Sequence, residues 1–554
     1  MVVAGTKGRG PATQLTGGQA LVQCLKAQGV EVVFGLPGIQ LDWLFDALYS
    51  ERDTIKVYHT RHEQAVSYMA DGYARTTGRV GICLMVPGPG VLNAMAGLAT
   101  AYACSSPVLC LTGQIPSNQI GAGRGLLHEI KDQLTALRSV TKWAARANRP
   151  EEIPGLAREA FWQLQSGHVR PVAIEVPLDV LQAAGEVTAI DRVEAERHPG
   201  DPEAMERVAK ALGGAERPII FTGGGVLQSG AWEPLRHLAE MLQAPVVMSR
   251  NGRGALSDRH YLAQIMVAAQ HLLPTSDVVL VVGTRFLEPA GSTWGPREGQ
   301  TVIQIDIDPE EIGRNAKVAV GVVADAHVAL ADLVARVPRH NRKRTSREDE
   351  LTAVRQKVRA LLSAVEPQAS YAMAIREVLP DDGILVSEST QVGYWAQWGG
   401  FPIYQPRTLV TSGYQGTLGY GFATALGVQV GAPSRKVVSI NGDGGFMYNV
   451  QELSTMVLHR LPVVTIVFND NAYGNVRRIQ KESFGGRLIA SDLANPDFVT
   501  MAESFGVDGL RARSPEELRS ALRQALGSGR PSLIEVPVAE MPNPFPIFRA
   551  GYRG

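Results

Sequence analysis

The sequence predicts an α/β protein built from three doubly wound parallel-sheet domains. Apolar runs of strand length alternate with longer helical patterns almost throughout the 554 residues. This rhythm is typical of parallel strands joined by crossover helices. A chain of this length also exceeds what one hydrophobic core normally serves. The clearest predicted strands are 80–86, 108–115, 218–222, 278–282, 302–307, 383–387, 436–440 and 463–468.

Changes in composition divide the chain. Stretches rich in proline and charge near 185–202 and 337–350 predict linkers. The predicted domains are therefore 14–185, 200–336 and 366–540, with a flexible Gly-rich N-terminus at 1–13, a linker at 337–365 and a tail at 541–554.

An internal echo supports this division. Residues 165–177 close the first domain and 527–537 close the last, each with an apolar run that ends in Glu-Val-Pro. Two related domains that flank a third explain the echo simply, and chance similarity of two buried strands is the alternative.

Charge and composition exclude several classes of function. Lys plus Arg and Asp plus Glu both total 54, so the formal net charge is zero and gives no electrostatic basis for binding nucleic acid or a membrane surface. The basic run 339–344 is interpreted as a solvated linker. No apolar run reaches the ~18 residues of a membrane span, and no signal-peptide core is seen. The four cysteines are expected to be buried free thiols, which favours a cytoplasmic protein.

Two acidic residues follow neighbouring predicted strands. Asp443 comes just after strand 436–440, and Asp470 just after strand 463–468, with a predicted helix at about 448–459 between them. Ligands of parallel sheets collect at the carboxyl ends of the strands, where a helix amino end also favours anions. Two carboxylates beside phosphate oxygens suit a hard cation such as Mg²⁺. The alternative is that both residues only cap turns.

Several motifs resemble those of thiamine diphosphate enzymes. Gly442-Asp443-Gly444, followed at this distance by Asn469-Asp470-Asn471, is similar to that family's cofactor motif. The resemblance to the acetolactate synthase group covers residues 15–545, with motifs that agree in order and spacing. The further motifs are Tyr58-His59-Thr60-Arg61-His62-Glu63-Gln64-Ala65, Met69-Ala70-Asp71-Gly72-Tyr73-Ala74-Arg75, Pro87-Gly88-Pro89-Gly90 with Asn93, Leu111-Thr112-Gly113-Gln114, and Ile305-Asp306-Ile307-Asp308 with Glu311-Ile312-Gly313.

The resemblance implies a pyrimidine-binding first domain, a central domain and a diphosphate-binding last domain. It implies that Asp443, the Asp470 side chain and the Ala472 carbonyl hold a Mg²⁺ ion that bridges to the diphosphate. Asp470 stands where the family usually has Asn, and an Asp oxygen is an equally good ligand.

Glu63 is the implied catalytic carboxylate, which hydrogen-bonds the cofactor's pyrimidine ring and promotes loss of the thiazolium C2 proton. Leu418 is the implied apolar support for the bent cofactor. Ser389, Thr390 and Gln391 match the loop that contacts the diphosphate, although the residue types depart from those usual in acetolactate synthases. The other implied cofactor contacts are Pro87, Gly88, Asn93, Gly416, Gly442, Gly444, Gly445, Tyr473 and Gly474.

The implied reaction forms an enamine from a 2-oxo acid, or a related carbonyl donor, and transfers it to a carbonyl acceptor. Gln40 and Gln114 are the implied catalytic neighbours of the reacting carbon, and only His128 follows Gln114 where some relatives carry a histidine pair for proton relay. This favours carboligation over aldehyde release. Substrate choice is expected to lie in these residues, in segment 473–486 and in the tail. Arg477 and Arg478 are interpreted as exposed, with contact to a substrate carboxylate as the alternative.

Other functions stay open at this stage. A non-ligating decarboxylase or C–C lyase of the same family is the nearest alternative. A dinucleotide-dependent oxidoreductase would use the Gly-rich turn at 222–227, which is interpreted instead as a tight strand–helix turn. A non-catalytic relative would not need Glu63. FAD is left open but not expected. The resemblance also implies a homodimer or homotetramer with active sites at the subunit interface.

Overall fold

The computed structural model describes residues 12–287 and 295–548. Residues 1–11 of the predicted flexible N-terminus and residues 549–554 of the predicted tail lie outside this part of the chain, whereas Thr13, predicted as flexible, begins strand β1. The described residues form two compact units. The first comprises the residues up to Glu196 together with Tyr414–Pro433 and Asn449–Leu461, and the second comprises the rest.

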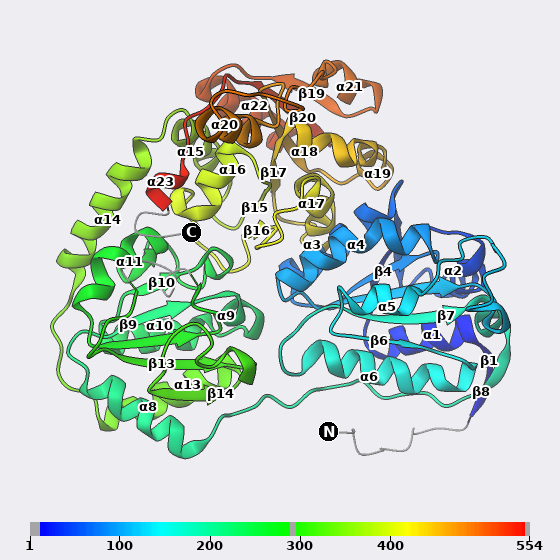
Figure 1. Cartoon of the computed structure of the whole chain (residues 1–554), viewed down its shortest axis with the longest axis horizontal. Coiled ribbons are helices and arrows are strands. Elements are labelled where there is room, and N and C mark those ends of the chain that lie inside the picture. Colours follow the sequence, from blue (N-terminus) through cyan, green and yellow to red (C-terminus); the bar gives the residue numbers. More distant parts are fainter. Residues whose placement is uncertain (1–11, 288–294, 549–554) are drawn as a thin grey trace. The chain divides into compact units, whose positions relative to one another are not determined.

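The first unit contains a six-stranded parallel sheet in the order β3-β2-β4-β5-β7-β6. Helices α1 and α6 lie on one side of this sheet and α3 and α4 on the other (Figure 1). A short antiparallel pair, β1 with β8, lies apart from it. The elements are β1 (Thr13–Thr16), α1 (Gly17–Ala27), β2 (Val32–Gly35), η1 (Ile39–Leu41), α2 (Asp42–Ser50), β3 (Lys56–His59), α3 (Glu63–Thr77), β4 (Gly81–Met85), α4 (Pro89–Ala103), β5 (Val108–Gln114), η2 (Ser117–Gln119), α5 (Gln133–Arg138), β6 (Trp143–Arg146), η3 (Pro150–Glu152), α6 (Ile153–Gln165), β7 (Val172–Pro177), α7 (Leu178–Gln182), β8 (Ala184–Val187), α17 (Tyr420–Gly431) and α19 (Leu453–Leu458).

The second unit contains two further six-stranded parallel sheets. The central sheet has the order β11-β10-β9-β12-β13-β14, and the last has the order β16-β15-β17-β18-β20-β19. The central elements are α8 (Pro202–Gly214), β9 (Ile219–Thr222), α9 (Gly224–Ser229), α10 (Trp232–Leu242), β10 (Val246–Met248), η4 (Arg250–Gly252), β11 (Ala263–Ile265), α11 (Met266–Leu272), η5 (Leu273–Thr275), β12 (Val278–Val282), β13 (Thr301–Asp306), η6 (Pro309–Glu311), β14 (Val320–Val323), α13 (Ala326–Arg336) and η7 (Val337–Arg339). The remaining elements are α14 (Glu348–Ser363), α15 (Gln368–Val378), β15 (Ile384–Ser387), α16 (Gln391–Trp395), η8 (Ala396–Gly400), β16 (Leu409–Thr411), β17 (Val437–Gly442), α18 (Asp443–Phe446), η9 (Met447–Glu452, shared with the first unit), β18 (Val464–Asn469), α20 (Gly474–Ser483), α21 (Phe498–Ser504), β19 (Asp508–Arg511), α22 (Pro515–Ser528), β20 (Ser532–Pro537) and α23 (Phe545–Phe548).

The predicted fold class is confirmed, and the repeated sequence at 165–177 and 527–537 corresponds to a repeat in the structure. The first and last sheets place their strands in the same sequence of positions: second, first, third, fourth, sixth and fifth in chain order. The echoed segments form β7 and β20, which occupy the same place in the two sheets. The similarity of the two segments therefore reflects two domains of one topology.

One predicted element differs. The helix expected at about 448–459 is instead the 3-10 helix η9 followed by the short helix α19, with α18 just before them. The helical geometry breaks at Asn449, whose φ of −128° is not helical. Its side-chain amide instead donates to the Gly419 carbonyl at 2.7 Å, a tertiary bond that the local sequence does not reveal.

The stretch predicted as a linker at 337–365 contains α14, which packs against α11 and α15. Within the basic run, Arg344 donates to the carbonyls of Leu212, Gly213 and Ala215 at the end of α8, so this arginine is held rather than solvated. Arg355 on α14 similarly donates to the carbonyls of His260 and Ala263.

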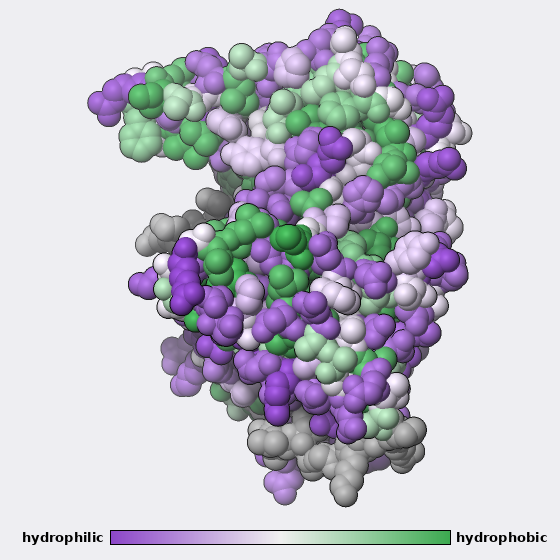
Figure 2. All heavy atoms as spheres, turned by 90° about the vertical axis from the view of Figure 1, so that its right-hand side faces the viewer, coloured by the Kyte–Doolittle hydropathy of each residue, from purple (hydrophilic) through white to green (hydrophobic). Residues whose placement is uncertain are grey.

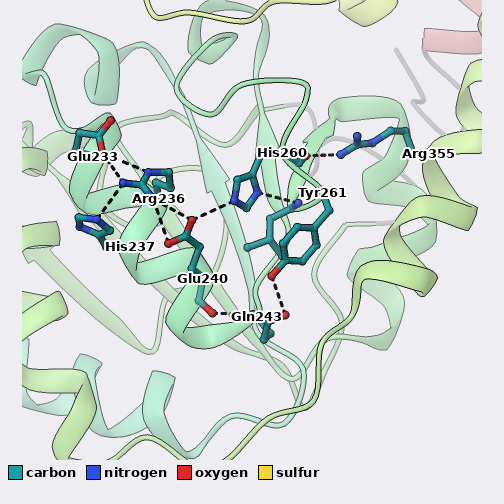
Figure 3. A network of polar contacts seen from close by, with 9 residues as sticks. Glu233, Arg236, His237, Glu240, Gln243, His260, Tyr261 and Arg355 are labelled. Atoms are coloured by element: carbon teal, nitrogen blue, oxygen red, sulfur yellow. Dashed lines mark hydrogen bonds and ion pairs between the residues drawn. The ribbon is translucent and has the colours of Figure 1, made fainter.

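The Arg355 contacts border a polar network in the central domain (Figure 3). His260 stacks on Tyr261 and bonds Glu240, which also pairs with Arg236. The polar groups drawn there bind one another, so we interpret the network as structural: it connects α10 to the segment before β11.

All four cysteines are free, three of them buried and Cys104 half-buried. Burial raises the pKa of the Cys24 thiol to about 12.

Among residues 12–287 and 295–548, no helix has both the length and the apolar character to cross a membrane.

Glycines set the spacing of three helices in the first unit. A Cβ atom at Gly72 of α3 would overlap the Thr424 carbonyl oxygen of α17, and one at Gly427 of α17 would overlap the Met69 carbonyl of α3. On the other flank of α3, a Cβ at Gly97 of α4 would overlap the Ser67 hydroxyl. Helix α3 is thus packed with its backbone close to that of α17, which lies beside it in Figure 1.

We expect Gly72→Ala to destabilise the protein by about 1–3 kcal/mol, because an added methyl group in a closed contact forces the helices apart. Gly155→Ala is the matched control, since Gly155 lies in α6 with no atom near its Cβ position. That change is expected to be neutral or stabilising by up to about 1 kcal/mol. Denaturant midpoints measure both variants, and equal stability of the two would contradict the packing account.

Candidate functional site

Glu63 is the first residue of α3, and local contacts fix the turn that precedes it. The His62 ring accepts a hydrogen bond from the Gln64 amide at 3.2 Å, as an N-cap. The Arg61 amide donates to both carboxylate oxygens of Glu452 at 3.1 Å. Glu452 is fully buried, and burial raises its pKa.

The Glu63 carboxylate is itself held inside the first unit. Glu63 is 9% exposed, and the Asn93 side-chain amide on α4 donates to its Oε2 at 3.0 Å. Gly90, in the first turn of α4, faces the same carboxylate. The structure therefore brings together Glu63, Asn93 and the Pro87–Gly90 turn, three sets of residues that the sequence predicts as cofactor contacts.

Gln40 and Gln114 are both buried in this unit. The Gln114 side-chain oxygen accepts from the next backbone amide, of Ile115, at 2.8 Å. Gln40 bonds the Leu127 carbonyl and the His128 ring. Direct contact of either glutamine with a reacting carbon stays a prediction.

Leu418 and Gly416 lie in a segment that belongs to the same unit as Glu63. The neighbouring Thr417 hydroxyl is 2.7 Å from that of Thr100 on α4. Leu418 is half-buried and Gly416 is exposed, with φ +61°, a conformation that favours glycine. The segment is thus anchored to α4, whose start carries Asn93.

In the second unit, Asp443 and Asp470 lie side by side at the carboxyl ends of β17 and β18. The two strands pair in parallel with Gly442 opposite Phe468, which places the next residues together. Burial raises the pKa of Asp443. Burial and the nearby Asp443 charge raise the pKa of Asp470 to about 6.

Asn495 joins this pair, and the sequence analysis missed it. Its side-chain amide lies 2.6 Å from Asp443 Oδ2 and 2.9 Å from Asn469 Oδ1. Asn495 is 52 residues from Asp443 in a long connection, so no local pattern marks it.

Ala472 is close to both carboxylates, because its backbone amide bonds each of them. Ala472 and Asp492 face each other in an isolated antiparallel β-bridge. Its two hydrogen bonds run from the Tyr473 amide to the Ser491 carbonyl and from the Leu493 amide to the Asn471 carbonyl. Neither bond uses the Ala472 carbonyl, the atom predicted as a metal ligand.

The predicted loop Ser389–Gln391 lies beside the same edge. Thr390 contacts the Cβ position of Gly442, and Gln391 opens α16. Gln391 is buried, yet its Oε1 has no hydrogen-bond partner among the described residues. Glu388, buried just before this loop, lies against Gly445. Its place after β15 is the signal that could have identified it.

Glycines again make room at this edge. A Cβ at Gly474 would overlap Asp470 Oδ2, and one at Gly444 would meet the Tyr473 ring at 2.7 Å.

Arg477 is partly exposed and pairs with Asp492, whereas Arg478 is buried beside Glu482 and Asn475. The expectation of an exposed surface is therefore wrong for Arg478, which packs inward from α20.

The donor set fits Mg²⁺ with a diphosphate. Within the described residues, no group of three or more His, Cys, Asp or Glu side chains is arranged to hold a metal alone. Two neighbouring carboxylates need further oxygen ligands, which a carbonyl and phosphate groups supply for this hard cation. The orphaned Gln391 Oε1 and the glycine-lined edge are in keeping with a bound polar group there.

The Gly-rich turn at 222–227 forms the tight strand–helix turn predicted, between β9 and α9. Cβ atoms at Gly223 and Gly225 would both overlap the backbone at Gly283. Close packing of two turns accounts for these glycines without a dinucleotide.

Comparison with known proteins identifies the family. Models of the thiamine pyrophosphate enzyme match in chain order: the N-terminal TPP-binding domain over 15–136, the central domain over 205–333 and the C-terminal TPP-binding domain over 388–536. A probable acetolactate synthase large subunit of Methanocaldococcus jannaschii is 35% identical over 94% of this chain and 92% of its own. A probable 2-ketoarginine decarboxylase of Pseudomonas aeruginosa is 34% identical over 95% and 94%, and acetolactate synthase isozyme 3 of Escherichia coli 32% over 92% of each. The chain therefore belongs to the thiamine pyrophosphate (thiamine diphosphate) enzyme family, with all three of its domains.

Proposed function

We propose that this protein is a thiamine diphosphate- and Mg²⁺-dependent carboligase of the acetolactate synthase type. It cleaves a C–C bond beside the carbonyl of a 2-oxo acid or related donor and transfers the fragment to a carbonyl acceptor. The observation that carries the proposal is the buried Glu63 carboxylate, which Asn93 holds at the start of α3.

When bound, thiamine diphosphate supplies a carbanion that adds to a carbonyl carbon and then accepts the electron pair of the breaking bond. Glu63 would hold a proton at the pyrimidine ring. Because Glu63 is buried, its carboxylate would exchange that proton with the ring rather than with water. Leu418 would support the bent cofactor. Asp443, Asp470 and the Ala472 carbonyl would hold the Mg²⁺ that neutralises the diphosphate.

A second candidate is a decarboxylase that releases its product as an aldehyde. The similarity to the 2-ketoarginine decarboxylase favours it. Product analysis with a 2-oxo acid, with and without an aldehyde acceptor, separates the two candidates.

The active form is proposed to be a homodimer or a tetramer of two such dimers. Several exposed apolar side chains of the first unit each adjoin a predicted site residue in sequence: Ile39, Leu92 and Leu127. Figure 2 shows apolar residues gathered in patches on the face that it draws. Apolar patches of this kind mark interaction surfaces, which supports sites completed by a second copy of the chain.

For Glu63→Gln we expect a folded, cofactor-binding protein in which exchange of the thiazolium C2 proton falls by about 10²–10⁴-fold. Glutamine keeps the shape and the Asn93 contact but cannot supply the charge. NMR of C2–H/D exchange on cofactor-saturated protein measures this. Glu31→Gln, an exposed position paired with Arg79, is the control. A wild-type exchange rate in Glu63→Gln would end the catalytic assignment.

Asp443→Ala and Asp470→Ala should each weaken Mg²⁺-dependent binding of thiamine diphosphate by at least about tenfold, because the cation loses a ligand. Calorimetric titration with Mg²⁺ in excess measures the affinity. Asp508→Ala, at the amino end of β19, should bind like the wild type. Unchanged affinity in both site variants would refute the metal assignment.

Mixing Glu63→Gln chains with Asp443→Ala chains tests the shared site. If each site takes Glu63 from one subunit and Asp443 from the other, a mixed dimer keeps one intact site, and random mixing restores about a quarter of wild-type activity. Sites formed within single chains would regain no activity, and that result would contradict the proposed assembly.

A further inference from the structure

The side chain of Gln133 is enclosed in the first unit and makes three hydrogen bonds. Gln133 is the first residue of α5 and is 1% exposed. Its Oε1 accepts from the Gly88 amide at 2.7 Å. Its Nε2 donates to the Gly113 carbonyl at 3.0 Å and to Glu175 Oε2 at 2.8 Å. This one side chain therefore connects α5 to strands β5 and β7 and to the turn that opens α4.

Two of these partners fix the direction in which the amide of Gln133 points. Arg146 of β6 forms an ion pair with Oε1 of Glu175, its register partner on β7. An ionised carboxylate and a backbone carbonyl can only accept hydrogen bonds, so the amide nitrogen of Gln133 must face Glu175 and Gly113. Its oxygen must then face Gly88. The fully buried Glu175 thus sets the orientation of Gln133.

Gly88 is the N-cap residue of α4, and it depends on this contact. Having no side chain, it supplies no cap hydrogen bond of its own. Its φ of +58° favours glycine, and the His128 carbonyl oxygen lies where a Cβ atom would stand. Because Gly88 is buried, its amide needs a partner within the protein, and Gln133 from another helix is that partner.

The start of α4 is also where this helix meets Glu63. A Cβ atom at Gly90 would lie 3.5 Å from Glu63 Oε1, and Asn93 Nδ2 donates to Glu63 Oε2 at 3.0 Å. Both oxygens of the carboxylate therefore meet the beginning of α4. None of the three hydrogen bonds of Gln133 reaches Glu63. A shift at Gly88 would nevertheless move the contacts of Glu63, because packed interiors transmit such shifts.

We propose that Gln133 is a positioning residue for the reaction. It holds the start of α4 against β5 and β7, so that Asn93 meets the Glu63 carboxylate in one fixed geometry. The bonds to β5 and β7 orient the amide of Gln133, and the bond to Gly88 holds the helix. Proton transfer by a carboxylate depends on its placement, so a small displacement lowers the rate without unfolding the protein. This inference rests on the proposed function, in which Glu63 is the catalytic carboxylate.

Gln133→Met tests this role, because methionine keeps the volume of glutamine and removes all three hydrogen bonds. We expect exchange of the thiazolium C2 proton, followed by NMR on cofactor-saturated protein, to fall by about 10–100-fold. Gln28→Met is the matched control. Gln28 is a buried glutamine of the same unit whose side chain bonds the Asp191 carbonyl and the Val193 amide. Both variants should lose stability in denaturant, and only Gln133→Met should lose C2 exchange.

A double-mutant cycle with Asn93→Ala shows whether Gln133 acts through the contact with Glu63. If it does, the double variant should exchange at about the rate of the slower single variant, because the contact is lost only once. A rate lowered by the product of the two single effects would contradict action through that contact. Gln133→Asn is measured in parallel, since it keeps an amide but is too short to bind Gly88 and Glu175 together. Its C2 exchange should also fall, and it carries the test if the methionine variant does not fold.

Two kinds of failure are distinguishable. Exchange at the wild-type rate in Gln133→Met or Gln133→Asn, with slow exchange in Glu63→Gln, would overturn only the role of Gln133. Exchange as slow in Gln28→Met as in Gln133→Met would indicate a general loss of structure and would overturn that role as well. A wild-type protein that binds no thiamine diphosphate, or normal exchange in Glu63→Gln, would contradict the proposed function itself and the positioning role with it.

Discussion

Backbone-against-backbone packing of α3 is the constraint on which the first unit depends. Gly72 and Gly427 let α3 and α17 touch, and Gly97 does the same for α4. Because Glu63 begins α3, Asn93 lies on α4 and Leu418 stands just before α17, the spacing of three helices sets the spacing of three predicted cofactor contacts. A methyl group in either contact would move those side chains relative to one another, since packed interiors transmit such shifts.

In the second unit, the main constraint is that two carboxylates lie close together in a partly buried place. Parallel pairing of β17 with β18 places Asp443 and Asp470 at one edge, where burial makes their charges costly. Asn495 and the Ala472 amide offset part of that cost by donating hydrogen bonds. A divalent cation offsets more, and it also attracts phosphate oxygens. The arrangement is therefore suited to an anionic ligand only through a metal.

The sequence predicts the sheets well because buried parallel strands are short continuous apolar runs, and the Asp443–Asp470 neighbourhood follows from strand order alone. It does not predict the break at Asn449, which depends on a bond to the distant Gly419 carbonyl. It also misses Asn495 and Glu452, whose partners are 52 and 391 residues away. Arg478 was misjudged because a charged residue on a polar helix normally faces water. Tertiary contacts of this kind leave no periodic trace in a single sequence.

The proposed function depends first on the binding of thiamine diphosphate to this protein. It is tested most directly by a mass spectrum of the ligand released with acid from the purified protein, after incubation with thiamine diphosphate and Mg²⁺ and removal of unbound cofactor. We expect thiamine diphosphate in an amount stoichiometric with the chain, and we expect it to be lost when the washing buffer contains a chelator. Release of a dinucleotide without any thiamine compound, or of no ligand at all, would contradict the proposed function.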